Sequence, residues 1–142
     1  MTSKKTFISS DANGNKTIDE TTYDAAGNEL TNKRNSTYFY ANGYQKENSV
    51  YESTYDSAGH QLTNKQNSTY FDDAGNKTGS YISYAVSTYD SSENQLNSKR
   101  NSTSFDANGY KTGSSITESI NTYDSSGYLL THEPVSYTHL TL

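Results

Sequence analysis

The sequence has no cysteine and no tryptophan, and its 142 residues include a single proline and only 11 lysines and arginines. Without cysteine, the chain can form neither a disulfide bond nor a thiolate metal site. The basic residues are scattered and the formal net charge is -5. A nucleic acid or an anionic membrane surface requires clustered basic side chains, so the sequence predicts no nucleic-acid partner.

Long hydrophobic segments are also missing. No run approaches the roughly 18 apolar residues of a membrane-spanning segment, so membrane insertion is not expected. Hydrophobic residues make up 30% of the chain, which limits any core to a thin one. Disordered chains share this low hydrophobicity but have few aromatics, whereas this chain has 14 tyrosines and 4 phenylalanines. Because threonine and tyrosine favour strands and no helical period is sustained, we expect an all-β fold.

One segment of nine residues occurs four times along the chain. Its copies are TYDAAGNEL at 22–30, TYDSAGHQL at 54–62, TYDSSENQL at 88–96 and TYDSSGYLL at 122–130. A second turn segment falls between them, as YFYANGYQK at 38–46, YFDDAGNKT at 70–78 and SFDANGYKT at 104–112, with a half-copy at 10–17. The period of 32 to 34 residues therefore contains two turns and the two segments that join them.

The Asp-x-x-Gly pattern of these segments is typical of a hairpin turn. Aspartate bonds nearby backbone amides and glycine accepts a positive φ, which suits a type I turn with a G1-type bulge. Eight such turns begin at Asp11, Asp24, Tyr40, Asp56, Asp72, Asp90, Asp106 and Asp124. Two depart from the pattern, because Tyr40 replaces the aspartate and Glu93 the glycine. We expect the turn at 90–94 to be the weakest, either strained or shifted so that Asn94 takes the left-handed conformation.

The turns predict an antiparallel meander of tandem β-hairpins, built as a twisted elongated sheet or a partly closed barrel. We expect residues 1–6 to be a flexible N-terminus and residues 7–133 to form the hairpin array. Residues 134–142 break the repeat, and VSYTHLTL at 135–142 resembles the translated end of a transposon adapter used in sequencing libraries. We therefore predict that this tail is not native and that the protein continues beyond Glu133. A native last strand is the alternative.

Pairing across the turns predicts a register in which Asp24 faces Asn28, Thr22 faces Leu30 and Thr54 faces Leu62. One face then gathers the candidate core, namely Ile18, Leu30, Val50, Leu62, Ile82, Tyr84, Val86, Leu96, Ile116, Ile120 and Leu130, with Tyr38 and Tyr70 nearer the turns. The opposite face carries two aromatic rows, Tyr23, Tyr55, Tyr89 and Tyr123 beside one set of turns and Phe39, Phe71 and Phe105 beside the other. The unpaired edges of such a sheet favour self-association.

The Tyr-Asp-x-x-Gly segments at 23–27, 55–59 and 123–127 resemble the YD repeats of the bacterial Rhs family and of the related teneurins. The resemblance covers the turns along most of residues 10–130. The Gly-x-x-x-Arg-Tyr lead-in of that family is missing, and the leucines fall three residues after the glycine position instead of two. The resemblance implies a sheet of hairpins, a secreted or cell-surface location in a bacterial protein, and a shell around another polypeptide. Eight hairpin turns are too few to enclose one alone.

No catalytic constellation or cofactor site emerges, so we predict that the chain is not an enzyme and has no cofactor. The segment at 11–22 resembles an EF-hand calcium loop, but Lys16 occupies the glycine position and Thr22 replaces the bidentate glutamate. It is better explained as the first hairpin turn. A calcium-binding row of turn carboxylates is a weaker alternative, because turn bonding already explains the aspartates. His60, His132 and His139 are too scattered to indicate a metal site.

The two aromatic rows are the candidate ligand-binding residues. Sugar rings stack on tyrosine and phenylalanine faces, and flat aromatic surfaces also anchor protein partners. Cross-strand packing explains the same rows without a ligand, at roughly 0.2–1 kcal/mol per pair. The first hypothesis is a noncatalytic spacer or shell segment of a secreted or cell-surface protein. The alternative is a carbohydrate-binding or adhesive module that uses the aromatic rows.

Overall fold

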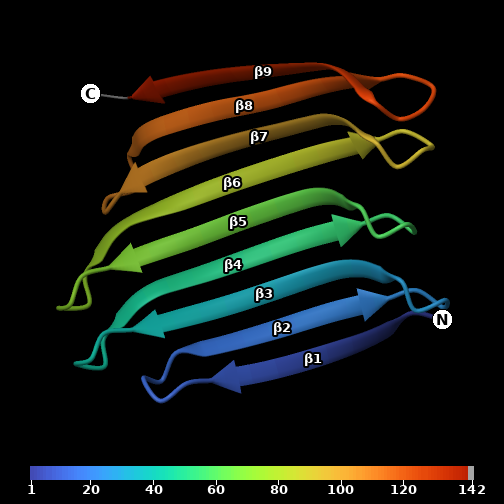
Figure 1. The fold of residues 1–142 in the computed structure, drawn as a ribbon. Coiled ribbons are helices and arrows are strands. Elements are labelled where there is room, and N and C mark those ends of the chain that lie inside the picture. The colour runs from blue at the N-terminus through green and yellow to red at the C-terminus, as the bar shows by residue number, and fades with distance from the viewer. Residues whose placement is uncertain (141–142) are drawn as a thin grey trace.

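The computed structural model describes residues 1–140, which form one sheet of nine strands and no helix. Each strand pairs antiparallel with its neighbours in the sequence, in the order β1 to β9 (Figure 1). The strands are β1 (Ser3–Ser10), β2 (Lys16–Tyr23), β3 (Glu29–Phe39), β4 (Gln45–Tyr55), β5 (Gln61–Phe71), β6 (Lys77–Tyr89), β7 (Gln95–Asp106), β8 (Lys111–Tyr123) and β9 (Leu129–Leu140). The predicted all-β meander of hairpins is confirmed.

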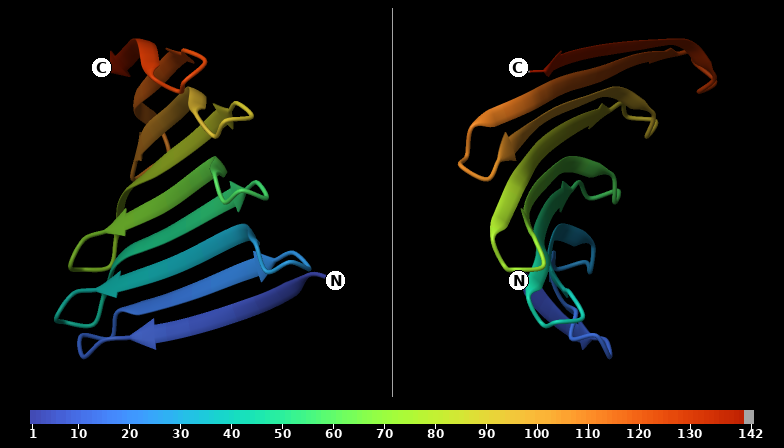
Figure 2. Two further views of the ribbon diagram at one scale, coloured as in Figure 1. Left: turned by 45° about the vertical axis from the view of Figure 1, so that its right-hand side comes forward. Right: turned by 90° about the vertical axis from the view of Figure 1, so that its left-hand side faces the viewer.

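The sheet is twisted and curls along its length, and it does not close into a barrel (Figure 2). Strands β1 and β9 each pair with one neighbour only, so the outer edges of the described sheet are unpaired. Of the two predicted forms, the structure has the open, elongated one. A right-handed twist is the ordinary consequence of strand sterics, and no second layer lies over the described strands to flatten it.

The Asp24 turn shows how each hairpin is closed. The Gly27 amide donates to the Asp24 carbonyl at 3.3 Å, the Asp24 amide donates to the Asn28 carbonyl at 2.9 Å, and Gly27 has a φ of 92°. The Asp24 carboxylate accepts the Ala26 and Asn28 amides at 2.8 and 2.9 Å. The same pair of backbone bonds closes all eight turns, which confirms the predicted positions of the hairpin turns.

The turn that begins at Asp90 keeps the geometry of the others although Glu93 replaces glycine. Glu93 has a φ of 69°, and its amide donates to the Asp90 carbonyl at 3.2 Å. The expectation that Asn94 would take the left-handed conformation is wrong, because the fourth turn position must have positive φ whichever residue occupies it. Glu93 is the one residue other than glycine with positive φ in the described chain. The strain is therefore kept at this position and does not shift the turn.

Seven hairpins contain a β-bulge near the turn. The bulge residue directly follows the first residue of the strand that leaves the turn. Thr22 faces Thr31 and Thr54 faces Thr63, so the predicted pairing of these threonines with Leu30 and Leu62 is wrong by one residue. The reason is that a bulge places two residues opposite one. The unpaired bulge residues are Leu30, Lys46, Leu62, Thr78, Leu96, Thr112 and Leu130. The threonine pairs bond through their hydroxyls, at 2.6 Å for Thr22 and Thr31.

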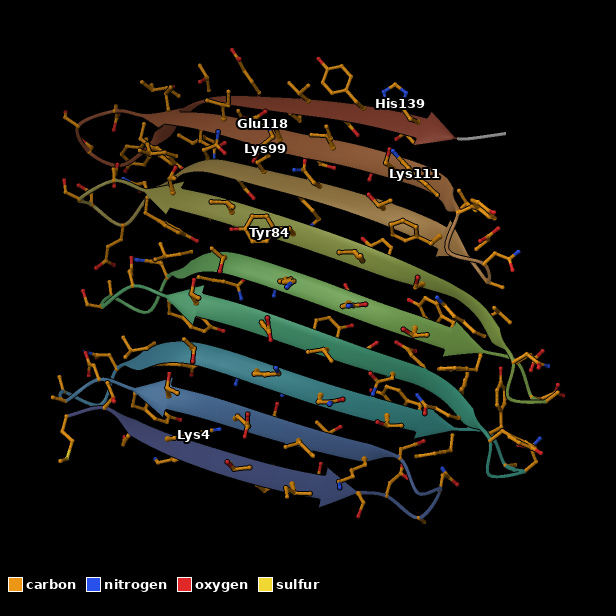
Figure 3. The ribbon with its side chains drawn as sticks, turned by 180° about the vertical axis from the view of Figure 1, so that it is seen from behind. Lys4, Tyr84, Lys99, Lys111, Glu118 and His139 are labelled. Atoms are coloured by element: carbon orange, nitrogen blue, oxygen red, sulfur yellow. The ribbon has the colours of Figure 1, made fainter. Side chains whose placement is uncertain are left out.

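Directly opposed residues lie on the same face of a sheet, so the register sorts the side chains into two faces. One face, which we call the aliphatic face, carries Ile18, Val50, Ile82, Tyr84, Val86, Ile116 and Ile120, together with charged residues. Figure 3 looks onto this face, on which Tyr84, Lys99 and Glu118 are labelled. The predicted grouping of these seven residues is therefore confirmed.

Two parts of the predicted face assignment are wrong. Tyr38 and Tyr70 lie opposite the aliphatic face, because each comes directly after a threonine, Thr37 or Thr69, that lies on that face. The phenylalanines lie on the aliphatic face and not with the tyrosine row, by the same alternation; these residues are Phe39, Phe71 and Phe105. The bulge residue in each hairpin shifts the register by one, and side chains alternate with a period of two.

The face opposite the aliphatic one, which we call the serine face, contains the five buried side chains of the described chain: Ser36, Ser49, Ser53, Ser68 and Ser83. Ser68 is fully buried, and its hydroxyl lies 2.7 Å from that of Ser49 on the neighbouring strand. Small hydroxyl side chains fit between longer neighbours and bond across the strands. Cross-strand polar pairs of this kind stabilise the middle of the sheet.

No hydrophobic side chain of the described residues is buried, so the prediction that the aliphatic face forms a core is wrong. Ile82 is 40% exposed and Ile120 is 43% exposed. The total accessible surface is 9267 Å², whereas a compact monomer of 15.7 kDa would expose about 7300 Å². The physical reason is the single layer, which leaves both faces in contact with solvent.

Both predicted end segments contain paired strand residues. Lys4 faces Thr22 and Thr6 faces Glu20, so a flexible segment over residues 1–6 is the wrong description from Ser3 onward. Backbone pairing with β2 orders these residues. At the other end, Pro134 faces Ser119 within β9. The adapter origin of residues 134–142 stays a prediction, and residues 141–142 of that tail lie outside the described residues.

Replacing Glu93 by glycine is expected to raise the free energy of unfolding by about 1 kcal/mol. A non-glycine residue in the left-handed conformation costs about 1–2 kcal/mol, and part of the gain from removing it is lost because glycine gives the unfolded chain more conformational freedom. Urea unfolding followed by circular dichroism measures the change. Ser92→Gly, one residue earlier in the same turn, is the matched control and should not stabilise. Equal unfolding midpoints for Glu93→Gly and the unchanged protein would contradict the assigned strain.

Candidate functional site

The predicted aromatic residues do not form one surface. Tyr23, Tyr55, Tyr89 and Tyr123 end strands β2, β4, β6 and β8 on the serine face. Phe39, Phe71 and Phe105 lie at the opposite end of the sheet, in β3, β5 and β7, on the aliphatic face. The two rows are thus separated by both the length and the thickness of the sheet, and a single ligand cannot bridge them.

Two members of the tyrosine row join neighbouring hairpins. The Tyr89 hydroxyl donates to the Gln61 carbonyl at 3.3 Å, and the Tyr123 hydroxyl donates to the Gln95 carbonyl at 3.0 Å. The Tyr89 ring also stacks on His60, with the ring centroids 4.5 Å apart. These bonds give Tyr89 and Tyr123 a structural role, because each connects one turn to the hairpin before it.

Tyr40, the residue that departs from the aspartate pattern, has an equivalent role at the other end of the sheet. Its hydroxyl donates to the Phe71 carbonyl at 2.9 Å, on the next hairpin. Asn42 in the same turn donates from its side chain to the Asp73 carbonyl at 2.7 Å. Within the turn, the Asn42 side-chain oxygen accepts the Tyr44 amide at 3.1 Å, one of the two amides that an aspartate accepts in the other turns. The sequence shows the substitution but not the partner, which lies 31 residues away.

A polar hollow that includes a predicted residue lies on the serine face between β3 and β4. We call it the β3–β4 groove; its volume is 570 Å³ and its lining residues are Glu29, Asn32, Arg34, Ser36, Tyr38, Tyr51, Ser53 and Tyr55. Tyr55 is the one member of the predicted rows in this lining. Small-molecule sites typically have volumes of about 300–1,000 Å³.

Arg34 is the cation of the β3–β4 groove, and it is already paired. Its Nε donates to Asp19 Oδ1 at 2.7 Å and its Nη2 donates to Asp19 Oδ2 at 3.2 Å. This hydrogen bonding raises the pKa of Arg34. A bidentate pair holds the guanidinium plane in place and offsets its charge. The groove therefore presents a fixed planar donor without a net positive field.

Tyr51 lines the β3–β4 groove, and its hydroxyl is bonded to the next strand. Gln66, on β5, donates from its side-chain amide to the Tyr51 hydroxyl at 3.0 Å. On the other side of the groove, the Asn32 side-chain amide donates to the Thr21 hydroxyl at 3.0 Å, which leaves its carbonyl oxygen directed away from that bond. Neither residue was identified from the sequence. Only the register of the strands brings them together in one groove.

The turn carboxylates are engaged in their own turns. Hydrogen bonds from the asparagine side chain four residues later lower the pKa of Asp11, Asp24 and Asp90, and those from His60 and from the Asn76 backbone lower the pKa of Asp56 and Asp72. Asp11 accepts the Asn13 and Asn15 amides like the other turns. Among the described residues, no group of three or more acidic or histidine side chains is placed to hold a metal ion.

The histidines are dispersed in the structure. His60 Nδ1 lies 3.0 Å from the Asp56 carboxylate in the turn between β4 and β5. His132 and His139 lie in β9 and, being an odd number of residues apart, point to opposite faces. His132 Nδ1 contacts the Asn121 side chain at 2.7 Å. His60 and His132 therefore have local partners, and no histidine lines the β3–β4 groove.

Comparisons with family models, with curated proteins and with solved structures find no match to this chain. The described residues contain no helix long and apolar enough to span a membrane.

The lowered pKa values of the turn carboxyls predict acid sensitivity. Each folded pKa lies below the unfolded value of about 3.9, so the stabilisation is present above that pH and is lost as the pH falls through the folded values. We expect the melting temperature of the unchanged protein to fall below about pH 4. Asp72→Asn should lower the melting temperature at pH 6, and the two melting temperatures should converge as the pH falls below the lowered pKa of Asp72.

Asp73→Asn is the matched control for Asp72→Asn, because among the described residues the Asp73 carboxylate accepts no hydrogen bond while carrying the same charge. The melting temperature of Asp73→Asn at pH 6 should stay close to that of the unchanged protein. Parallel melting curves for Asp72→Asn and the unchanged protein at every pH would contradict the role given to the turn carboxylates.

Removing the Tyr123 hydroxyl tests the connection between hairpins. Tyr123→Phe keeps the ring but loses the bond to the Gln95 carbonyl, and we expect it to lower the free energy of unfolding by about 0.5–1.5 kcal/mol. Urea unfolding provides the measurement. Tyr55→Phe is the control, since among the described residues the Tyr55 hydroxyl makes no hydrogen bond to a neighbouring hairpin. Equal losses in both variants would be evidence against the connecting role.

Proposed function

We propose that this chain is a noncatalytic spacer or shell segment of a secreted or cell-surface bacterial protein. The observation that supports the proposal most is that the same contact between neighbouring hairpins recurs along the sheet. Successive hairpins add at the same edge, through the Tyr89 bond to Gln61 and the Tyr123 bond to Gln95. Each hairpin contacts only its neighbours, so the number of hairpins can change without a change of fold.

The absence of a buried core among the described residues supports the same proposal. A globular domain depends on a core of fixed volume, whereas here the stability comes from strand ladders and cross-strand pairs that every added hairpin brings with it. The side chains with altered pKa values bond within turns or in exposed cross-strand pairs, as Lys33 and Glu52 do at 2.9 Å. Such exposed pairs contribute little individually and perform no chemistry. The YD resemblance of the turns supports the secreted or surface location.

Duplicating residues 23–54 tests whether the array extends as a spacer would. The insert adds two strands after Thr54, so we expect the sheet to lengthen by about 10 Å along the strand order, at about 4.8 Å per strand. Spin labels on Thr6→Cys in β1 and Asn101→Cys in β7 report the distance by pulsed electron resonance. The chain has no native cysteine, so only these two positions are labelled.

The control carries the same insert with its copies of Gly27 and Gly43 replaced by valine, which cannot adopt the positive φ that these turns need. It should give no defined new distance. A label distance that does not grow in the first variant, or a loss of sheet signal in circular dichroism, would contradict the proposed spacer.

A further inference from the structure

We propose that the β3–β4 groove binds a neutral oligosaccharide, with Tyr51 as the central stacking residue. The groove is lined by three tyrosines, namely Tyr38, Tyr51 and Tyr55. Tyrosine rings present flat apolar faces to the C–H faces of sugar rings, and groups at their edges bond hydroxyls. This site goes beyond the structural role proposed above, since a spacer requires no ligand.

Tyr51, a lining residue of the groove, departs from the repeating pattern. It faces Arg34, and the residues at the corresponding positions of the later hairpins are Ser83, which faces Gln66, and Thr117, which faces Arg100. A residue needed for the hairpin fold is needed in every hairpin. Since serine or threonine suffices twice, the large aromatic side chain of Tyr51 is not required by the sheet.

Tyr55 belongs to the recurring tyrosine row but differs from its counterparts in its contacts. Tyr89 and Tyr123 each donate their hydroxyl to a carbonyl of the preceding hairpin. Among the described residues, the Tyr55 hydroxyl makes no bond of this kind, and its ring lines the groove instead. Tyr55 is therefore free to bond a ligand hydroxyl at one end of the groove.

The shape of the groove suits a chain of sugar rings. Its lining on β3 runs from Glu29 to Tyr38, which corresponds to about 30 Å of extended strand. Tyr38, 41% exposed, lies at one end and Tyr55 at the other, with Tyr51 between them. Aromatic faces distributed along a groove fit a linear oligomer better than a single sugar.

The charges of the groove favour a neutral ligand. Asp19 offsets the positive charge of Arg34 through the bidentate bond, and the remaining lining charge is the Glu29 carboxylate. A sulfated or uronic acid oligosaccharide would meet this carboxylate without a free cation to balance it. The Asn32 carbonyl oxygen and the Glu29 carboxylate supply polar atoms that can bond sugar hydroxyls.

The experiment uses cellohexaose, maltohexaose and chitohexaose as neutral probes and a heparin hexasaccharide as the anionic probe. Saturation-transfer difference spectra are recorded with irradiation of the aromatic protons, because saturation of the protein reaches the ring protons of a sugar that is bound to it. We expect transfer to at least one neutral hexasaccharide at millimolar concentration and none to the heparin fragment. Calorimetric titration of the probe that shows transfer then gives its dissociation constant.

Tyr51→Ser introduces the residue that the next hairpin has at Ser83, so the sheet tolerates it. We expect this variant to bind about tenfold more weakly, the loss of one aromatic contact. Tyr51→Phe keeps the ring, and its dissociation constant should stay within about threefold of that of the unchanged protein. This change is smaller than the change expected when an aromatic contact is lost. Tyr84→Ser, on the aliphatic face, is the matched control and should not change the affinity. Tyr38→Ser, which copies Ser104 of β7, provides a second groove variant if Tyr51→Ser does not fold.

Three results would overturn the proposal: no transfer to any neutral hexasaccharide, transfer to the heparin fragment alone, or equal affinities for the groove variants and Tyr84→Ser. None of these results bears on the spacer proposal, because that proposal is tested by the distance across the lengthened sheet and not by binding.

Discussion

The closed hairpin turn is the constraint on which every other feature of this sheet depends. In each aspartate turn the carboxylate accepts two backbone amides, as Asp24 does from Ala26 and Asn28, and the fourth residue is held at positive φ. These bonds reverse the direction of the chain within five residues at each turn. Because the turns recur at a nearly constant spacing, each strand has the length of its neighbour and pairs with it. A meander is the direct consequence.

A sheet closed in this way is stabilised without a hydrophobic core. Its buried side chains are serines, and Ser49 and Ser68 bond across adjacent strands at the centre of the serine face. Stability is distributed along the array, since each hairpin contributes its own ladder and its own contacts to the hairpin before it. Local departures from the pattern are tolerated for this reason. Tyr40 replaces a turn aspartate and bonds the Phe71 carbonyl. Tyr51 stands where later hairpins have a small residue, and it lines the β3–β4 groove.

The candidate site could be predicted from the sequence only in part. Tyr55 belongs to a recurring row and was identified by its period, whereas Tyr38 was assigned to the wrong face and Tyr51 carries no periodic signal. The wrong face for Tyr38 follows from the register of β3. The bulge at Leu30 moves the register by one residue, and a one-residue change exchanges the two faces of a strand. The groove also consists of side chains from two strands, so its members lie far apart in the repeat.

The sequence by itself determined the class of fold, the eight turns and the alternation of side chains along each strand, because turn chemistry acts within five residues and does not depend on distant contacts. The tertiary structure decided the register beyond each bulge, the face on which the phenylalanines lie, and the partners of Tyr89 and Tyr123. It also decided that the aliphatic face stays exposed. These features depend on how one hairpin lies against the next, and that arrangement is set by backbone ladders between strands rather than by any local pattern.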